Sequence, residues 1–184
     1  MKTKSYTKNL GNLLIILSVI ILTFIYLPIL KIYFFSPKEI LIPTNTLAIV
    51  IPKIHASSPI IPNVNAWNKT EYQSKLKQGI AHAKGTAIPG EKGISLLFAH
   101  SSDLPWNITR VNTAFFRLNE LKKNDRFYII KNGKRIEYKV VMVKTVWLNE
   151  TEFLNDKKND FLILQTCTPI GTDLKRLLVF SKRT

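Results

Sequence analysis

The sequence contains a single cysteine, Cys167, among its 184 residues. One thiol cannot form an intramolecular disulfide, and no cysteines and histidines follow the spacing of a structural zinc site. Glycine is also scarce, with seven residues, while 46% of the residues are hydrophobic, which excludes collagen-like and disordered chains. The composition therefore indicates a folded domain whose one thiol needs an explanation.

Acidic residues are few as well. Twelve aspartates and glutamates stand against 27 lysines and arginines, so the net charge is +15 at pH 7. Such a charge suits nucleic acid, an anionic cell envelope or simply a lysine-rich surface. The sequence has no aromatic RNA-binding strand motif, no helix-turn-helix signature and no arginine cluster, so we expect no nucleic-acid partner.

Charge is missing altogether from Asn9 to Leu30, a stretch rich in leucine and isoleucine. About 20 apolar residues suffice to cross the hydrocarbon core of a bilayer as a helix. Three lysines precede this stretch, and no acidic residue occurs before Glu39, so the positive-inside rule places the N-terminus in the cytoplasm. The alternative is a cleaved signal peptide, which has a shorter apolar core and small residues at its exit rather than the aromatic residues Tyr33, Phe34 and Phe35.

These features predict four regions along the chain. Residues 1–9 form a cytoplasmic tail, residues 10–35 an uncleaved transmembrane signal-anchor, residues 36–46 a linker and residues 47–184 a folded domain. We therefore expect a single-pass protein of the cell membrane whose domain lies outside the cytoplasm.

The domain contains short apolar runs separated by turn residues, a pattern typical of strands. The pair Asn132-Gly133 favours a type I′ turn between two strands of a hairpin. We expect strands at residues 47–51, 94–99, 127–130, 136–143, 143–148, 161–166 and 177–180. The pattern predicts a mostly β fold, a closed or nearly closed β-barrel with one or two short helices.

Helical signals in the domain are few. Thr70 is a candidate N-cap for a short helix that carries Tyr72, Leu76 and Ile80 on one face. A second short helix is expected over residues 114–121, and we assign its bulky apolar side chains to the core.

Cys167 has two interpretations. Free cysteine is most often a small buried hydrophobic residue, whereas a nucleophile needs a cation or imidazole that lowers its pKa. Cys167 ends an apolar run and precedes the turn-rich residues 168–171, a position at which a side chain is reachable. His100 also ends an apolar run, and Arg176 lies where the chain enters its last strand. The three would form a nucleophile, an acid/base and an anion stabiliser, although spacing alone leaves both interpretations open.

Other polar residues are assigned structural or surface roles. We expect His82 to be structural, His55 to lie in a surface loop and Asp103 to be solvated. Lys175 precedes Arg176, so in a strand the two side chains point to opposite faces, and Lys175 is no substitute for the arginine.

Two segments resemble the signature of the sortase family. Residues 164–177 read LQTCTPIGTDLKRL, which resembles the family's T-L-x-T-C strand, its loop and its arginine. Residues 98–101 read FAHS, which resembles the strand-end histidine of the same family. Two further segments match sortases in the right order, GIAHAKGTAIPG at 79–90, followed by Glu91, and FRLNEL at 116–121.

The resemblance covers about Leu47 to Thr184 and departs from the family pattern at two positions. Ile163 stands where the signature has its first threonine, and Ile94 stands where an asparagine often occurs. Both departures concern substrate preference rather than the cysteine, histidine and arginine.

The resemblance implies a β-barrel cysteine transpeptidase. It makes Cys167 the nucleophile, His100 the general acid/base and Arg176 the stabiliser of the oxyanion or substrate. The same resemblance implies a set of substrate-binding residues, Thr166, Leu164 and Ser101.

A sortase cleaves an LPxTG-like sorting signal through a thioester, here on Cys167, and transfers the acyl group to an amine. The implied partners are surface proteins that carry such a signal and an amine acceptor, either a peptidoglycan precursor or a pilin lysine. No metal or organic cofactor is needed for these steps. Two alternatives stay open, an exported cysteine protease that uses water and an inactive barrel that only binds peptides.

Overall fold

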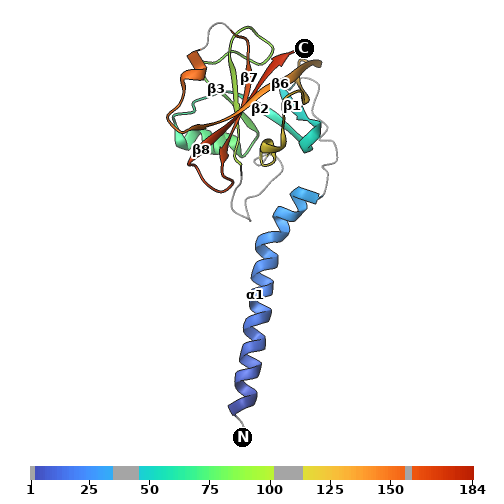
Figure 1. Ribbon diagram of the computed structural model, residues 1–184, viewed down its shortest axis with the longest axis vertical. Coiled ribbons are helices and arrows are strands. Elements are labelled where there is room, and N and C mark those ends of the chain that lie inside the picture. The colour runs from blue at the N-terminus through green and yellow to red at the C-terminus, as the bar shows by residue number, and fades with distance from the viewer. Residues whose placement is uncertain (1–2, 35–45, 102–113, 156–158) are drawn as a thin grey trace. The chain divides into compact units, whose positions relative to one another are not determined.

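The computed structural model describes residues 3–34, 46–101, 114–155 and 159–184. The chain divides into two compact units, one with the long helix α1 (Thr3–Phe34) and the other with the strands. Figure 1 shows α1 in blue and the β-rich unit in cyan to red.

Helix α1 contains the uncharged stretch of the sequence. Its segment Lys8–Leu27 is long and apolar enough to cross a membrane. The helix begins by Thr3, so part of the tail expected at residues 1–9 is helical. The predicted apolar N-terminal helix is confirmed, and its insertion into a bilayer stays a prediction.

Eight strands make up the second unit. They are β1 (Ala48–Ile51), β2 (Ala56–Val64), β3 (Ile80–Ala83), β4 (Ser95–Phe98), β5 (Arg126–Lys131), β6 (Lys134–Trp147), β7 (Leu162–Thr168) and β8 (Lys175–Arg183). They form a closed barrel in the order β1-β2-β3-β4-β7-β8-β6-β5, in which β5 also pairs with β1. The predicted closed β-barrel is therefore confirmed.

The predicted hairpin joins β5 and β6. Its turn residues Asn132 and Gly133 have φ angles of 50° and 71°, both in the left-handed region that a type I′ turn requires. Strand β6 continues to Trp147, so the two runs expected at 136–143 and 143–148 are one strand.

The helices of the domain are short. The expected helix near Thr70 is α2 (Lys69–Leu76), but its N-cap is Asn68, whose side chain accepts a hydrogen bond from the Glu71 N–H at 3.1 Å. The prediction of Thr70 as the cap is wrong because the helix has already begun at that residue. Ile80 belongs to β3 and not to the helix.

Three 3-10 helices complete the described elements, η1 (Pro52–Ile54), η2 (Leu118–Glu120) and η3 (Glu152–Asn155). Over residues 114–121 only η2 forms, so the second predicted helix is reduced to a single turn. The assignment of this segment to the core is confirmed, since Phe115 and Leu118 are fully buried.

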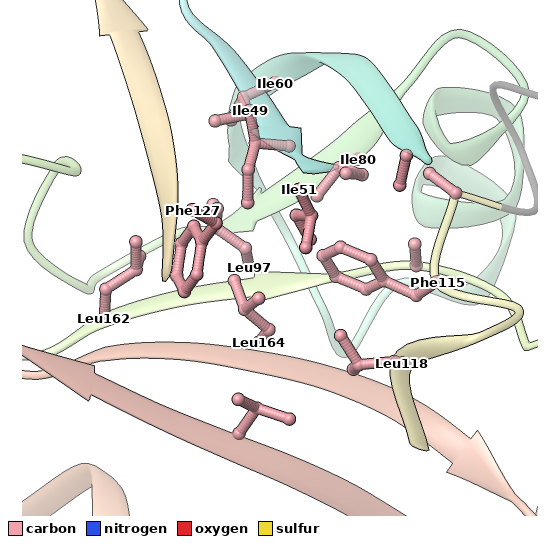
Figure 2. Packing of buried hydrophobic residues seen from close by; sticks show 14 of the residues in the cluster. Ile49, Ile51, Ile60, Ile80, Leu97, Phe115, Leu118, Phe127, Leu162 and Leu164 are labelled. Atoms are coloured by element: carbon pink, nitrogen blue, oxygen red, sulfur yellow. The ribbon is translucent and has the colours of Figure 1, made fainter. Parts of the chain in front are cut away.

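Side chains fill the inside of the barrel and also cover part of its outside. Along β7, Leu162 and Leu164 belong to the interior cluster, whereas Ile163 belongs to a second cluster on the opposite face. Figure 2 shows the interior cluster, in which residues from distant parts of the chain meet: Ile49, Ile51, Ile60, Ile80, Leu97, Phe115, Leu118, Phe127, Leu162 and Leu164. The strand alternation therefore places Cys167 on the same outer face as Ile163.

Candidate active site

Cys167 lies one residue before the end of β7 and is half-buried. Its direct partner across the antiparallel pair is Arg176, near the start of β8. The guanidinium Nη1 donates to the Cys167 Sγ at 3.2 Å, and the same nitrogen contacts the carbonyl oxygens of Asp173 at 3.2 Å and Lys175 at 3.4 Å. These contacts place a positively charged group beside the thiol.

The environment of Cys167 acts on its pKa in opposite directions. Burial raises the pKa of the thiol, the nearby Arg176 charge lowers it, and the Asp173 carboxylate raises it. Burial dominates, so the pKa of Cys167 is raised rather than lowered, and the resting protein holds a thiol. The expected cation, Arg176, is present, but its effect on the pKa of Cys167 is smaller than the effect of burial.

His100 reaches the same place from β4. Strands β4 and β7 are parallel neighbours in which Phe98 pairs with Gln165. Two residues further along the chain come Cys167, still in β7, and His100, just past the end of β4. The alignment continues past the strand, because the Ala99 N–H donates to the Gln165 carbonyl at 3.2 Å. Parallel pairing therefore brings together two residues that are 67 positions apart in the sequence.

The three predicted catalytic residues line one cavity of about 450 Å³. Helix α2 forms one side of it, the outer face of β4 and β7 forms its floor, and the connection from β7 to β8 forms the other side. Its lining includes Lys69, Tyr72, Gln73 and Leu76 from α2, Phe98, His100, Gln165 and Cys167 from the floor, Thr172 and Asp173 from the connection, and Arg176 from β8. The cavity is an open groove that a thiol, an imidazole and a guanidinium all line.

The residues of this groove lie in a region of the chain that matches a known protein family. The family model of the sortase domain matches residues 49–184, which is most of the chain. The chain belongs to the sortase family.

The relatives agree with this assignment. The chain is 29% identical over 137 residues to Sortase D of Bacillus subtilis (strain 168), covering 72% of this chain and 61% of that protein. It is 28% identical over 131 residues to Sortase A of Bacillus anthracis, covering 71% of this chain and 56% of that protein. Among solved structures, sortase C-1 from Actinomyces oris has a TM-score of 0.62 and 34% identity, covering 75% of this chain and 73% of that one. The chain thus spans about 60% of the length of the curated sortases that it matches.

The substrate-binding residues expected in this sortase domain fall into two groups. Thr166 and Ser101 line the groove, although both are buried and the Thr166 hydroxyl donates to the Ala99 carbonyl at 3.0 Å. Leu164 is fully buried in the interior cluster, so its side chain cannot contact a peptide and that prediction is wrong. Its neighbour Gln165 points to the outer face and lines the groove instead.

Sequence reasoning missed part of this site. The strict alternation of side chains along β7 would have singled out Gln165, since Cys167 lies two residues further on the same face. Tyr72 and Gln73 had no such signal, because nothing in the sequence showed that α2 packs against β2 and β3 and that Tyr72 contacts the Phe98 ring of β4.

The other histidines of the domain have the roles expected of them. His82 is fully buried, its Nδ1 accepts from the Asn63 N–H at 3.3 Å, and its Nε2 lies 3.0 Å from both the Ala87 carbonyl and the Thr86 hydroxyl. Burial lowers the pKa of His82, which favours the neutral ring. His55 is exposed after η1.

Of the two other polar residues considered, the structure describes only Lys175. Lys175 points away from Arg176, since its Nζ lies 4.2 Å from the centre of the Trp147 ring. Asp103 lies outside the described residues. Within the part of the chain that the structure describes, no three His, Cys, Asp or Glu side chains are grouped to hold a metal ion.

Proposed function

We propose that this sortase is a cysteine transpeptidase in which Cys167 is the nucleophile, His100 the general acid/base and Arg176 the oxyanion stabiliser. The observation that carries the proposal is the 3.2 Å contact between Arg176 Nη1 and Cys167 Sγ in a groove that His100 also lines. A buried cysteine with a purely structural role needs neither a guanidinium partner nor an open groove.

The first half of the reaction forms a thioester. The Cys167 proton passes to the His100 imidazole as Sγ attacks the carbonyl carbon of the scissile peptide bond. The guanidinium of Arg176 donates to the oxyanion of the tetrahedral intermediate. The carbon–nitrogen bond then breaks, and His100 returns the proton to the departing amine.

The second half consumes the thioester. An amine nitrogen attacks the thioester carbonyl, its proton passes to His100, and the carbon–sulfur bond breaks to restore the Cys167 thiol. A thioester reacts with amines more readily than an amide does, so the exchange needs no ATP. Every proton is carried by a side chain of the groove.

We further propose that the acyl donor is a surface protein with an LPxTG-like sorting signal, anchored to the cell wall or joined to a pilin-like subunit. The groove beside α2 and the outer face of β4 and β7 supports an extended peptide as the ligand. The apolar segment of α1 supports a single membrane span, with residues 36–46 as a linker and residues 47–184 as the extracytoplasmic catalytic domain. Transfer to an amine rather than to water distinguishes this function from a protease.

The test uses the full chain in detergent micelles with an LPxTG-type peptide. Mass spectrometry should detect an acyl group on Cys167, which is unambiguous because the chain has no other cysteine. Cys167→Ala and His100→Ala should each abolish cleavage, while His55→Ala, which changes an exposed histidine, should retain it. Full cleavage by Cys167→Ala would contradict the proposal, and release of the acyl group to water despite an added amine would indicate a protease.

A further inference from the structure

A separate cavity lies at the end of the barrel opposite to Cys167. Strands β4 and β7 begin there, at Ser95 and Leu162, and β8 ends there, at Arg183. The cavity has a volume of about 420 Å³, which is in the range of small-molecule sites, and it shares no lining residue with the groove. Because five strand residues separate Leu162 from Cys167, the cavity is roughly 17 Å from the thiol.

Two buried hydroxyl groups line this cavity. Ser95 is 3% exposed, and its Oγ has no hydrogen-bond partner in the part of the chain that the structure describes. Tyr138 is also buried, and its hydroxyl oxygen accepts a hydrogen bond from the Gly90 N–H at 2.8 Å. Burial raises the pKa of Tyr138, so its hydroxyl keeps a hydrogen that it can donate. An acceptor that enters the cavity therefore meets two buried donors, one of which is unsatisfied without it.

Three cationic side chains line the same cavity, Lys92, Lys182 and Arg183. Among the described residues, none of the three forms an ion pair with a carboxylate. The Lys182 Nζ donates instead to the Asn159 amide oxygen at 3.1 Å, and the Arg183 Nη1 donates to the Gly90 carbonyl at 3.2 Å. These contacts hold two of the cations at the cavity without neutralising them.

Two carboxylates also line the cavity, and both have partners. Glu91 accepts from the Lys131 Nζ at 2.8 Å, and Asp160 accepts from the Gly93 N–H at 2.7 Å. The three lining cations together with Lys131 outnumber these two carboxylates. The cavity is therefore net positive, which suits an anionic ligand.

A row of like charges on neighbouring strands adds to this positive charge. Lys139 of β6 lies directly opposite Arg126 of β5 on one side and Lys182 of β8 on the other. Like charges that face each other in a sheet destabilise it. Arg126 has the Glu137 carboxylate at 3.8 Å, whereas Lys139 and Lys182 form no ion pair within the described chain. An anion beside Lys182 offsets this repulsion.

We propose that the cavity binds a phosphate ester. A phosphate group has more acceptor oxygens than a carboxylate, and these oxygens match the two hydroxyls and the cations, above all Lys182 and Arg183. The esterified carbon atoms lie against the apolar part of the lining, Phe161 and Leu162. A lipid headgroup and a soluble phosphate ester share this chemistry. The site is independent of the reaction at Cys167.

The test measures binding of glycerophosphate to the full chain in detergent micelles by isothermal titration calorimetry. We expect saturable binding that glycerol does not show and that weakens as the salt concentration rises. Inorganic phosphate should bind more weakly, because it has no carbon atoms to contact Phe161. Equal affinity for inorganic phosphate would overturn the assignment of an ester, and no binding of glycerophosphate would overturn the site.

Ser95→Ala tests the unsatisfied hydroxyl. It should raise the Kd for glycerophosphate by roughly tenfold or more, since a hydrogen bond to a charged group is lost. It should not lower the Tm of the unliganded protein, because the hydroxyl has no partner among the described residues. The matched control is Ser181→Ala, which removes another buried and unpartnered hydroxyl that does not line the cavity. Equal Kd values in the two variants would contradict the inference.

Charge variants locate the ligand. Lys182→Gln should raise the Kd by roughly two- to fivefold. Lys144→Gln removes the same charge from an exposed position on β6 outside the cavity and should leave the Kd unchanged. Arg176→Ala removes the cation of the groove and should also bind normally. A loss of binding in Arg176→Ala, or equal losses in the two lysine variants, would overturn this site.

Micelles that contain phosphatidylglycerol distinguish the two sources of a phosphate ester. Competition with glycerophosphate that the wild type shows and Ser95→Ala lacks supports a lipid headgroup. An unchanged affinity for glycerophosphate supports a soluble ester. Cleavage of an LPxTG-type peptide is measured on the same samples, so failure of the phosphate site and failure of the proposed function are seen separately.

Discussion

The contact between Arg176 and Cys167 gives the sharpest test of the chemistry. The guanidinium Nη1 is held by the carbonyls of Asp173 and Lys175 while it donates to the Cys167 Sγ at 3.2 Å. Because these carbonyls fix the donor before substrate arrives, little reorganisation is needed when the oxyanion forms. Arg176→Ala removes the donor and the charge together.

The expected loss follows from that geometry. Removing one preorganised oxyanion donor lowers kcat by about 10² to 10³, which corresponds to about 2.7–4 kcal/mol. The Arg176 charge also lowers the pKa of Cys167 against the effect of burial, so the variant should have a still higher thiol pKa. Both effects act in the same direction on thioester formation.

Two assays measure these effects separately. Peptide cleavage gives kcat/KM, and the rate of iodoacetamide alkylation against pH reports the thiolate of the only cysteine. In Arg176→Ala the pH profile of alkylation should move to higher pH. Arg176→Lys retains a positive charge, so it should keep much of the thiolate, but it loses the planar pair of guanidinium donors. Lys175→Ala is the control, since that cation lies over Trp147. Unchanged alkylation and turnover in Arg176→Ala would refute the reasoning.

Three further predictions concern the core and the groove. Because burial lowers the pKa of His82, the unfolded chain takes up a proton below about pH 6.5 before the folded one does, so the free energy of unfolding should fall as the pH drops below that value. Melts from pH 5 to 7.5 should show this loss in the wild type and a smaller one in His82→Gln, and equal slopes would contradict it. Leu164→Ala should cost about 2–5 kcal/mol of stability as a cavity in the core. Gln165→Ala should leave the Tm nearly unchanged and raise the KM for the peptide, and the reverse pattern would contradict the assignment of faces.

Local signals in the sequence predicted the parts of the fold that depend on neighbouring residues. The Asn132-Gly133 turn follows from the left-handed φ angles that these two residue types tolerate. The uncharged stretch before residue 31 predicted α1 by length and composition alone. Neither feature requires knowledge of which strands pair.

Strands β2 and β3 were missed for physical reasons that involve distant residues. β2 contains Pro59 and Pro62, which cannot donate to a sheet, yet it lies between β1 and β3. Gly79 approaches this strand so closely that a Cβ at that position would collide with the Pro59 carbonyl oxygen. β3 is only four residues long and contains two alanines, which have low strand propensity.

The sequence predicted that Cys167, His100 and Arg176 belong together, and they line one groove, but it did not predict the side chains around them. His100 and Cys167 could be identified because each follows an apolar run, where a strand ends and a side chain becomes reachable. Leu164 was misassigned because a signature motif names consecutive residues, whereas a strand sends them to opposite faces. The part of the groove that α2 forms depends on tertiary packing, which cannot be predicted from a local sequence pattern.

The alternation of side chains along β7 separates the proposed catalytic side chains from the hydrophobic core of the barrel. Cys167 shares the outer face of β7 with Ile163 and Gln165, while Leu162 and Leu164 fill the interior. Strand β7 lies between its parallel neighbour β4 and its antiparallel neighbour β8. His100 follows β4 and Arg176 lies in β8, so each neighbouring strand brings one of these side chains to the groove that Cys167 lines. Because the proposed catalytic groups lie outside the barrel, interior substitutions should act on stability and outer-face substitutions on catalysis. The contrast between Leu164 and Gln165 tests this separation with two adjacent residues.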